Sequence, residues 1–504
     1  MLGVAGVAWW WTGGGGASSL EPESGAEQRR PDVVVLLWDT VRADRLSAYG
    51  HSRPTTPNLE RLAKGARLYE RAQSPAMWTV PAHGSMFTGL SVPTHGARVG
   101  WLWLDEHHVT LAEHFGAAGY TTFAWSANPY LSPATNLLQG FEDVRLTWMG
   151  DEAAPCAAAT RSKLLPTDAS VALAPAYAGD AEGWAEHLTL GKDCAPRGTD
   201  ALLDVLDRSD EPVFAYLNLL EAHHPRVPSL GGRQAVLREE QIRAGLSTDG
   251  SLRRLMGAME GQESFTDDEI EALFGVYDAS LRDLDQSLGQ LLDGLERRQA
   301  LDETIIVVVG DHGEHFGEDG RFDHRWSVHQ ALLHVPLVVH APGLGAERVK
   351  EPVSTMGLFG TLPQLAGIGA PRPDAPTLDD RGPVYSALVA PTPRLPEVMT
   401  TWPDLPPRRW QVRYGAVVDG PLKFVRDDQG REALFDVVND PAQVKPLDRP
   451  EDAARLGKLL ASWRRSQPRY DPSRRTTVDR PGRPLEQDDA TRAQLEALGY
   501  LGDP

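Results

Sequence analysis

Residues 304–312 read TIIVVVGDH, an apolar run that ends in a glycine, an aspartate and a histidine. Two other segments have the same character: VVVLLW at 33–38, which Asp39 follows, and VFAYLNLL at 213–220. Short runs this rich in β-branched and aromatic residues indicate strands buried on both faces rather than buried pieces of helix. Because amphipathic stretches separate them, the sequence predicts an α/β fold, with a doubly wound, mostly parallel central sheet flanked by helices.

Ionisable residues follow each of these predicted strands. Asp39 follows the first, His223 comes shortly after the second, and Asp311 and His312 follow the third. The carboxyl ends of parallel strands form the ligand-binding edge of such a sheet, so we expect these side chains to meet. A single strand-end aspartate often makes only a turn or a helix cap, but three coincident cases favour a site. The oxygen and nitrogen donors, without thiolates, suit Mn²⁺, Mg²⁺, Ca²⁺ or Zn²⁺.

A short helix is predicted within residues 78–89, WTVPAHGSMFTG. Pro81 suits the first turn and Gly89 the end, which puts Thr79 at or next to the N-cap. Thr79 there either caps the helix or offers a metal-activated hydroxyl as a nucleophile beside an anion-binding helix terminus. His83 lies on the same face as Thr79 and either packs within the helix or hydrogen-bonds a bound oxyanion. The predicted ligands of one divalent metal ion are Asp39, Thr79, Asp311 and His312.

Residues 310–343 are unusually dense in histidine, acid and glycine. His324 in this segment, together with His223, is the best candidate for binding the substrate or protonating the leaving group. Asn128, in the segment SANPYLS, is interpreted as a turn residue, with a place at the site entrance as the alternative.

Length and charge restrict the class of protein. A chain of 504 residues predicts one large domain and a smaller one, since single cores stop growing at about 250–300 residues. A formal charge of -20 argues against nucleic acid or an anionic membrane as a partner. An anionic substrate then needs a local positive centre, which a metal ion provides. The two cysteines, Cys156 and Cys194, either pair as a disulfide or are separate thiols.

Composition along the chain predicts its organisation. We expect a leader or flexible arm over 1–30, a catalytic domain over 31–370 with an insertion at about 145–260, and a small α+β C-terminal subdomain and tail over 371–504. The leader has an apolar run of about ten residues followed by small residues, as in a signal peptide, although Lys and Arg are absent before Arg29. Because a span needs about 20 residues, we expect no transmembrane segment. The predicted location is periplasmic or extracellular, with the cytoplasm as the alternative.

An ordered series of segments resembles the sulfatase-type branch of the alkaline phosphatase superfamily over most of the chain. The segments are DTVRADRLSAYGH, TPNLERLAKG, WTVPAHGSMFTG, GYTTFAWSANPYLS, QGFEDV, LNLLEAHHP, GDHGEHFGEDG, VPLVV, ALFDVVNDP and LEALGYLG. The resemblance implies a doubly wound α/β core with a small C-terminal subdomain. It also implies one divalent metal at the strand ends and a covalent intermediate on the residue at position 79.

The chain departs from the family pattern at the nucleophile. Typical sulfatases carry a Cys or Ser in a C/S-x-P-S-R motif that is converted to formylglycine, whereas this chain has TVPAH at 79–83. The β-methyl group of Thr79 blocks that conversion, so we expect no formylglycine. Asp311 and His312 stand where calcium-dependent sulfatases commonly have Asp-Asn. The combination resembles the phosphonate and phosphoester hydrolases and the lipid-phosphate transferases of the superfamily, in which the metal is often manganese or zinc.

These features predict an enzyme, a metal-dependent hydrolase acting on ester bonds. It is expected to cleave phosphate esters or phosphonates through a phospho-threonine at Thr79, with His223 or His324 protonating the leaving alcohol. One alternative is a sulfuric ester hydrolase (a sulfatase) that acts without formylglycine, and another is a phosphoglycerol- or phosphoethanolamine-type transferase. A non-catalytic binding relative is a third. The expected partner is a small-molecule or a lipid- or glycan-linked anionic ester.

Overall fold

The computed structural model describes residues 29–164, 191–389, 411–471 and 489–497. Almost all of the predicted leader, and parts of the predicted insertion and C-terminal tail, lie outside the described residues. The chain divides into two units, residues 1–30 and residues 31–504, and the second contains all the elements below. None of the described helices is long and apolar enough to cross a membrane.

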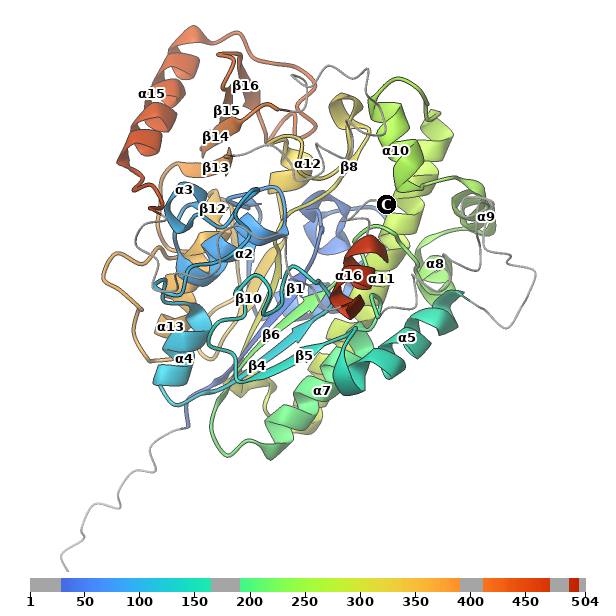
Figure 1. Ribbon diagram of the computed structural model, residues 1–504, viewed down its shortest axis with the longest axis vertical. Helices are drawn as coiled ribbons and strands as arrows, with labels where there is room; N and C mark the ends of the chain where they lie inside the picture. The colour runs from blue at the N-terminus through green and yellow to red at the C-terminus, as the bar shows by residue number, and fades with distance from the viewer. Residues whose placement is uncertain (1–28, 165–190, 390–410, 472–488, 498–504) are drawn as a thin grey trace, which may run out of the picture. The chain divides into compact units, whose positions relative to one another are not determined.

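A mostly parallel sheet of eight strands forms the centre of the fold (Figure 1). Its strands, in spatial order, are β11 (Glu347–Val349), β2 (Arg67–Tyr69), β10 (Leu337–His340), β7 (Thr304–Gly310), β1 (Asp32–Trp38), β6 (Val213–Leu219), β4 (Thr121–Ser126) and β5 (Asp143–Leu146). Within the described sheet, β10 alone runs against its neighbours. All the other pairings are parallel. The predicted fold class is therefore confirmed.

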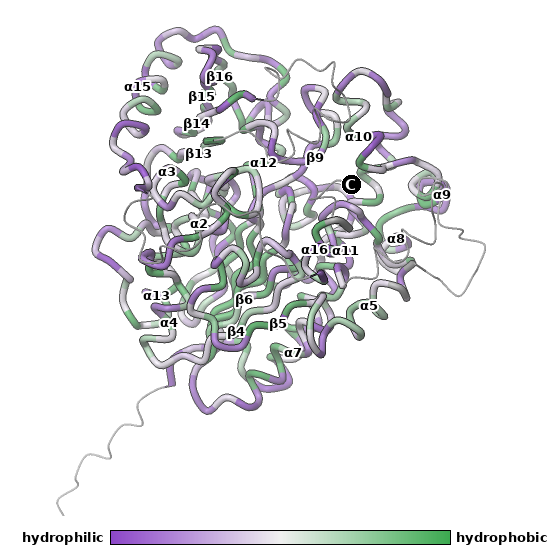
Figure 2. Tube along the Cα trace, in the orientation of Figure 1, coloured by the Kyte–Doolittle hydropathy of each residue, from purple (hydrophilic) through white to green (hydrophobic). Residues whose placement is uncertain are grey.

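Alternate residues of β1 enter two separate cores, one on each face of the sheet. The core that receives Val33, Val35 and Leu37 lies against α2 (Thr79–Thr88), α4 (Leu111–Ala117) and α13 (Leu358–Leu365). The core that receives Val34, Leu36 and Trp38 lies against α1 (Pro57–Ala63), α7 (Ala195–Arg208) and α11 (Asp267–Arg297). Figure 2 shows the hydrophobic residues concentrated in the strands between these helices. Burial on both faces explains why the strands are apolar throughout.

The three apolar runs of the sequence are the three central strands. β1 lies between β6 and β7, and every residue of β6 and β7 is buried. The register sets Trp38 level with Leu219 on one side and with Gly310 on the other. The residues that follow these strands therefore emerge together at one edge of the sheet, as the sequence predicts.

A small antiparallel sheet follows the central domain in the chain. Its strands are β13 (Val384–Leu388), β14 (Tyr414–Asp419), β15 (Leu422–Asp427) and β16 (Glu432–Asp436), and α15 (Pro450–Ser466) packs on it through Leu456 and Leu460. Helix α16 (Asp489–Ala497) instead contacts the central domain, where Trp148 Nε1 donates to Thr491 Oγ1 at 3.0 Å. The small α+β unit agrees with the predicted fold class, and its boundary at residue 371 stays a prediction.

The region predicted as an insertion, about 145–260, contains helices and the central strand β6. Cys156 in α5 and Cys194 at the start of α7 form a disulfide, with their Cα atoms 5.3 Å apart. The helices of this region besides α7 are α5 (Gly150–Leu164), α8 (Leu230–Val236), α9 (Glu239–Ser247) and α10 (Leu252–Met259). The remaining elements are α3 (Val92–His95), α12 (Gln330–Leu333), and the strand pairs β3 (Ala72–Gln73) with β12 (Val353–Ser354) and β8 (His315–Phe316) with β9 (Phe322–Asp323).

Helix α11 clamps a strained turn directly after β1. Thr40 has φ 58°, in the left-handed region that β-branched residues rarely adopt. The Tyr277 hydroxyl of α11 donates to the Thr40 carbonyl at 2.8 Å and accepts from the Arg42 backbone nitrogen at 2.9 Å. Because Tyr277 is fully buried, these bonds satisfy backbone groups that water does not reach. The clamp fixes the backbone beside Asp39.

Replacing Tyr277 tests this clamp. We expect Tyr277→Phe to lower the free energy of unfolding by about 1–3 kcal/mol, because it leaves two buried backbone groups without a partner. Tyr216→Phe is the matched control, since Tyr216 is also buried but its hydroxyl has no hydrogen-bond partner among the described residues. Urea unfolding monitored by fluorescence gives both values. Equal losses in the two variants would contradict the clamp.

Candidate active site

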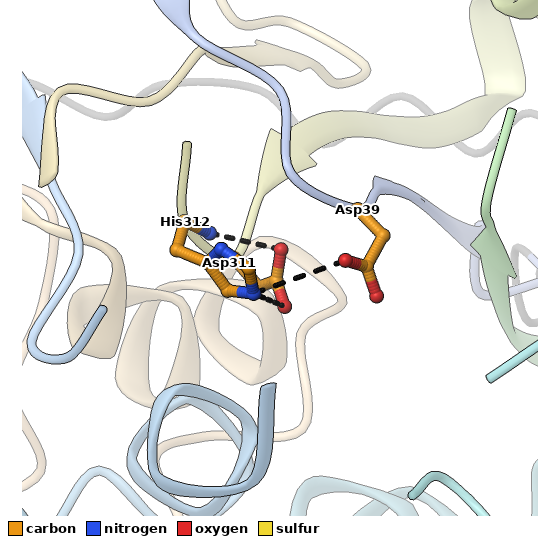
Figure 3. A group of neighbouring side chains, drawn as sticks. All are labelled: Asp39, Asp311 and His312. Atoms are coloured by element: carbon orange, nitrogen blue, oxygen red, sulfur yellow. Dashed lines mark hydrogen bonds and ion pairs between the residues drawn. The ribbon is translucent and has the colours of Figure 1, made fainter. Parts of the chain in front are cut away.

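The ends of β1 and β7 bring three predicted metal ligands to one place (Figure 3). Asp39 directly follows β1, and Asp311 and His312 directly follow β7. His312 Nε2 lies 3.3 Å from Asp311 Oδ2 and 3.8 Å from Asp39 Oδ1. All three side chains are fully buried. The structure thus brings these three residues together at the strand edge where the sequence places them.

The atoms that face one another lack the hydrogen bonds that buried polar atoms normally make. Asp39 Oδ1, Asp311 Oδ2 and His312 Nε2 have no hydrogen-bond partner within the part of the chain that the structure describes. The ligand atoms of the three residues lie within 4.8 Å of one another. Nδ1 of His312 donates to the Gly313 carbonyl at 3.0 Å, which leaves the lone pair on Nε2. Two carboxylate oxygens and a neutral imidazole nitrogen fit a divalent cation.

Each carboxylate is fixed through one oxygen and offers the other. Asp311 Oδ1 accepts from the backbone nitrogens of His312 at 2.8 Å and Thr40 at 3.3 Å. Asp39 Oδ2 accepts from the side-chain amide of Asn128 at 2.9 Å. Ligand groups held in this way keep their orientation before a metal ion binds.

Burial makes charge on the ligand side chains unfavourable. It raises the pKa of the Asp39 carboxyl. Burial, together with the Asp39 charge, raises the pKa of Asp311 well above its usual range. Burial also lowers the pKa of His312 well below its usual range, so that imidazole is neutral. Two buried carboxylates this close stay ionised together only beside a cation.

Thr79 is the first residue of α2 and lies beside the ligand cluster. Its Oγ1 accepts from Asn128 Nδ2 at 3.3 Å, and the same amide donates to Asp39 Oδ2. The N-cap of α2 is Trp78, and no side chain caps the helix. The capping role considered for Thr79 is therefore wrong, because the residue already has helical geometry and its hydroxyl contacts Asn128. That hydroxyl remains available for chemistry.

His83 lies one turn further along α2. Its Nδ1 is 2.8 Å from the Thr79 carbonyl, to which it donates, and 3.7 Å from Asp311 Oδ2. Burial lowers the pKa of His83 to about 3, so the imidazole is neutral and Nε2 carries a lone pair. The geometry supports a role for His83 in holding the first turn of α2. The predicted hydrogen bond to a bound oxyanion would require the other tautomer.

The two histidines expected to contact the substrate lie next to His312. The ring centroid of His324 is 4.5 Å from that of His312 and 5.3 Å from that of His223. His223 Nδ1 donates to the His224 carbonyl, and burial lowers the pKa of His223 well below its usual range. Burial alone would lower the pKa of His324, but the carboxylates of Asp323 and Glu314 together outweigh it and the pKa is raised. Of the two, His324 is the better proton donor.

Sequence reasoning missed the polar residues that support these groups. Asn218 donates to Asp39 Oδ2 at 3.2 Å, and a lone amide inside the apolar run VFAYLNLL was the available signal. The interpretation of Asn128 as a turn residue agrees with its Oδ1, which accepts from the Tyr130 nitrogen at 3.0 Å. What sequence reasoning missed is its amide contact with Asp39, which the strand-end rule applied to β4 would have suggested. Glu314 and Asp323, which contact His324, carried no signal beyond the polarity of their segment.

Comparison with known proteins agrees with this fold. A protein family described as Sulfatase matches residues 31–368. The choline-sulfatase of Rhizobium meliloti is 28% identical over 203 residues, which is 40% of this chain and 38% of that protein. The ulvan-active sulfatase of Formosa agariphila is 24% identical over 468 residues, covering 87% of this chain and 83% of that protein.

Solved structures share the fold. The phosphonate monoester hydrolase of Agrobacterium radiobacter superimposes with a TM-score of 0.64 at 21% identity, covering 87% of this chain and 96% of that one. By contrast, the chain matches less than two thirds of the choline-sulfatase. At 21% identity, structural similarity establishes that the fold is shared. It does not establish that this chain acts on the substrates named for those proteins.

Metal binding should stabilise the folded chain through Asp39 and Asp311. After EDTA treatment, we expect Mn²⁺ or Zn²⁺ to raise the thermal unfolding midpoint. The gain should reach about 2.7 kcal/mol when free metal is 100 times the dissociation constant. Asp311→Asn should remove most of this gain, whereas the exposed Asp210→Asn should keep it. Differential scanning fluorimetry gives the midpoints. An undiminished gain in Asp311→Asn would place the metal elsewhere.

Proposed function

Because the chain belongs to the sulfatase family, we propose that it is a metal-dependent hydrolase of monoanionic esters that uses Thr79 as its nucleophile. Phosphonate monoesters and phosphodiesters are the preferred class. The observation that carries the proposal is the Asn128 amide, which contacts both the Thr79 hydroxyl and the Asp39 carboxylate. The family and the names of the relatives support hydrolysis of ester bonds.

Asp39, Asp311 and His312 would hold the metal ion, with Thr79 beside them. When bound, a divalent cation supplies positive charge that lowers the pKa of the Thr79 hydroxyl and offsets the charge of the ester. Asn128 fixes Oγ1 relative to Asp39, so the nucleophile is oriented before the substrate arrives. A hydroxyl nucleophile also requires no conversion to formylglycine, which the β-methyl group of Thr79 blocks.

The covalent step uses groups that the chain supplies. Oγ1 of Thr79, after losing its proton to water, attacks phosphorus and forms an oxygen–phosphorus bond. The bond from phosphorus to the leaving oxygen breaks, its electron pair stays on that oxygen, and His324 supplies a proton to it. Water then attacks the phospho-threonine and restores the hydroxyl. His223, which is neutral and donates to a backbone carbonyl, is the weaker candidate for the acid.

The charge of the buried site favours a monoanion. The two carboxylates of Asp39 and Asp311 balance a divalent cation, and His312 and His83 are neutral. A dianionic phosphate monoester would therefore bury more uncompensated charge than a phosphonate monoester or a phosphodiester does. Sulfate monoesters are also monoanions, and the names of the relatives make them the second candidate.

The disulfide bears on location. Cys156 and Cys194 pair, and both are buried. Disulfides persist in oxidising compartments and are rare in the cytosol. The pair therefore supports a periplasmic or extracellular location, which we propose for the protein.

Two substitutions at position 79 test the nucleophile. We expect Thr79→Ala to lower kcat by at least about a thousandfold, because no other group replaces the hydroxyl. Thr79→Ser keeps the hydroxyl and is the matched control, with a loss of less than about tenfold. Metal content should be measured for both variants. Comparable turnover by Thr79→Ala and the wild type would remove Thr79 from the mechanism.

A panel of p-nitrophenyl esters tests the substrate class. We expect kcat/KM for bis(p-nitrophenyl) phosphate and p-nitrophenyl phenylphosphonate to exceed that for p-nitrophenyl phosphate by at least about tenfold. That ratio corresponds to about 1.4 kcal/mol for burying the extra charge. A preference for p-nitrophenyl sulfate would favour the second candidate. A preference for the phosphate monoester would contradict the charge argument.

A further inference from the structure

A turn with an unusual backbone holds His324. Asp323 has φ 65° and Arg325 has φ 90°, so the residues on both sides of His324 lie in the left-handed region. Residues other than glycine occupy this region at an energetic cost, and such residues cluster at functional sites. The surrounding contacts must therefore stabilise this conformation.

Contacts between buried charged groups hold the turn. Asp323 Oδ1 lies 2.9 Å from His324 Nδ1, and Asp323 Oδ2 accepts from Arg325 Nη2 at 2.8 Å. Glu314 Oε1 lies 3.3 Å from the same Nδ1, and Glu314 Oε2 accepts from Arg226 Nη2 at 2.5 Å. Cationic and anionic groups therefore alternate from Arg226 to Arg325, with the imidazole in the middle. Buried acids and bases paired in this way keep a fixed geometry.

The contacts argue against a second metal ion in this cluster. The ligand atoms of Glu314, Asp323 and His324 lie within 4.8 Å of one another, which is close enough to share a cation. Each carboxylate, however, already accepts from a guanidinium group, and both lie against the same imidazole nitrogen. A metal ion here would be repelled by Arg226 and Arg325. The cluster is better explained as a support for the His324 ring.

Because carboxylates surround Nδ1, Nε2 is the ring atom left for chemistry. His324 Nε2 is buried and has no hydrogen-bond partner in the described segments. The ring lies beside His312, one of the candidate metal ligands, and His223. We propose that Asp323 and Glu314 are positioning residues, which hold Nε2 of His324 toward the leaving group of the ester. This inference rests on the proposed function, since it concerns the ester cleaved at Thr79.

The positioning residues act through the proton on Nε2. As the bond between phosphorus and the leaving oxygen breaks, that oxygen keeps the electron pair and takes the proton from Nε2 of His324. The ring retains the proton on Nδ1, which stays directed at Asp323. An aspartate beside a catalytic histidine in serine hydrolases likewise fixes the tautomer and stabilises the imidazolium. Arg325 and Arg226 keep the two carboxylates in place.

Asp323→Asn tests the proposal, because asparagine tolerates the left-handed backbone and keeps the size of the side chain. We would measure kcat/KM for phenylphosphonate esters whose leaving groups range from p-nitrophenol to an aliphatic alcohol. The alcohol ester should lose about 100-fold or more and the p-nitrophenyl ester less than about threefold, since a poor leaving group needs the proton. Glu314→Gln should give the same pattern with a smaller loss.

Asp319→Asn is the matched control. Asp319 is exposed, has φ 52° and pairs with Arg321 in the loop between β8 and β9. Its substitution should leave the dependence on the leaving group unchanged. Metal content and the thermal unfolding midpoint report folding of each variant. Equal losses for all leaving groups in Asp323→Asn and Glu314→Gln overturn the proposal. Failure of the proposed function would show instead as turnover that survives in Thr79→Ala.

Discussion

Two buried carboxylates that face each other, those of Asp39 and Asp311, are the constraint on which the site depends. Each has one oxygen held by hydrogen bonds and one oxygen without a partner in the described chain. Burial disfavours charge on both, so a cation is what allows them to remain ionised together. The parallel pairing of β1 with β7 brings the two carboxylates to one edge of the sheet. The Tyr277 hydroxyl holds the strained turn at Thr40, directly after β1, by a hydrogen bond. The fold thus places two buried negative charges side by side, and a bound metal ion would compensate them.

A metal ion at these carboxylates would also allow a chain with a formal charge of -20 to bind the proposed anionic ester. A bound cation would supply positive charge at Asp39 and Asp311, and in the His324 network guanidinium groups balance the carboxylates that hold the ring. His83 and His312 are neutral and add none. An ester that carries one negative charge therefore suits the site better than one that carries two. The proposed preference for monoanionic esters therefore follows from the number of buried charges at the site.

Much of the fold and of the ligand set could be predicted from the sequence, because both depend on local patterns. Apolar runs predict the buried strands, and the strand ends predict Asp39, Asp311 and His312. The strand-end rule also reaches Asn128, which follows β4, but it does not predict that one amide contacts both Asp39 and Thr79. Asp323 is adjacent to His324 in sequence, but its proposed role depends on a left-handed backbone conformation that the local sequence does not predict. The capping role of Thr79 failed because the helix begins one residue earlier than a cap requires.

The proposed mechanism requires that the Thr79 hydroxyl become covalently attached to phosphorus during turnover. The most direct measurement is rapid acid quench of the metal-loaded protein with p-nitrophenyl phenylphosphonate, followed by mass spectrometry of the proteolytic peptides. We expect a phenylphosphonyl group on Thr79 that accumulates within the first turnover and disappears when the substrate is exhausted. Release of p-nitrophenol without any modified peptide, or modification of a different residue, would contradict it.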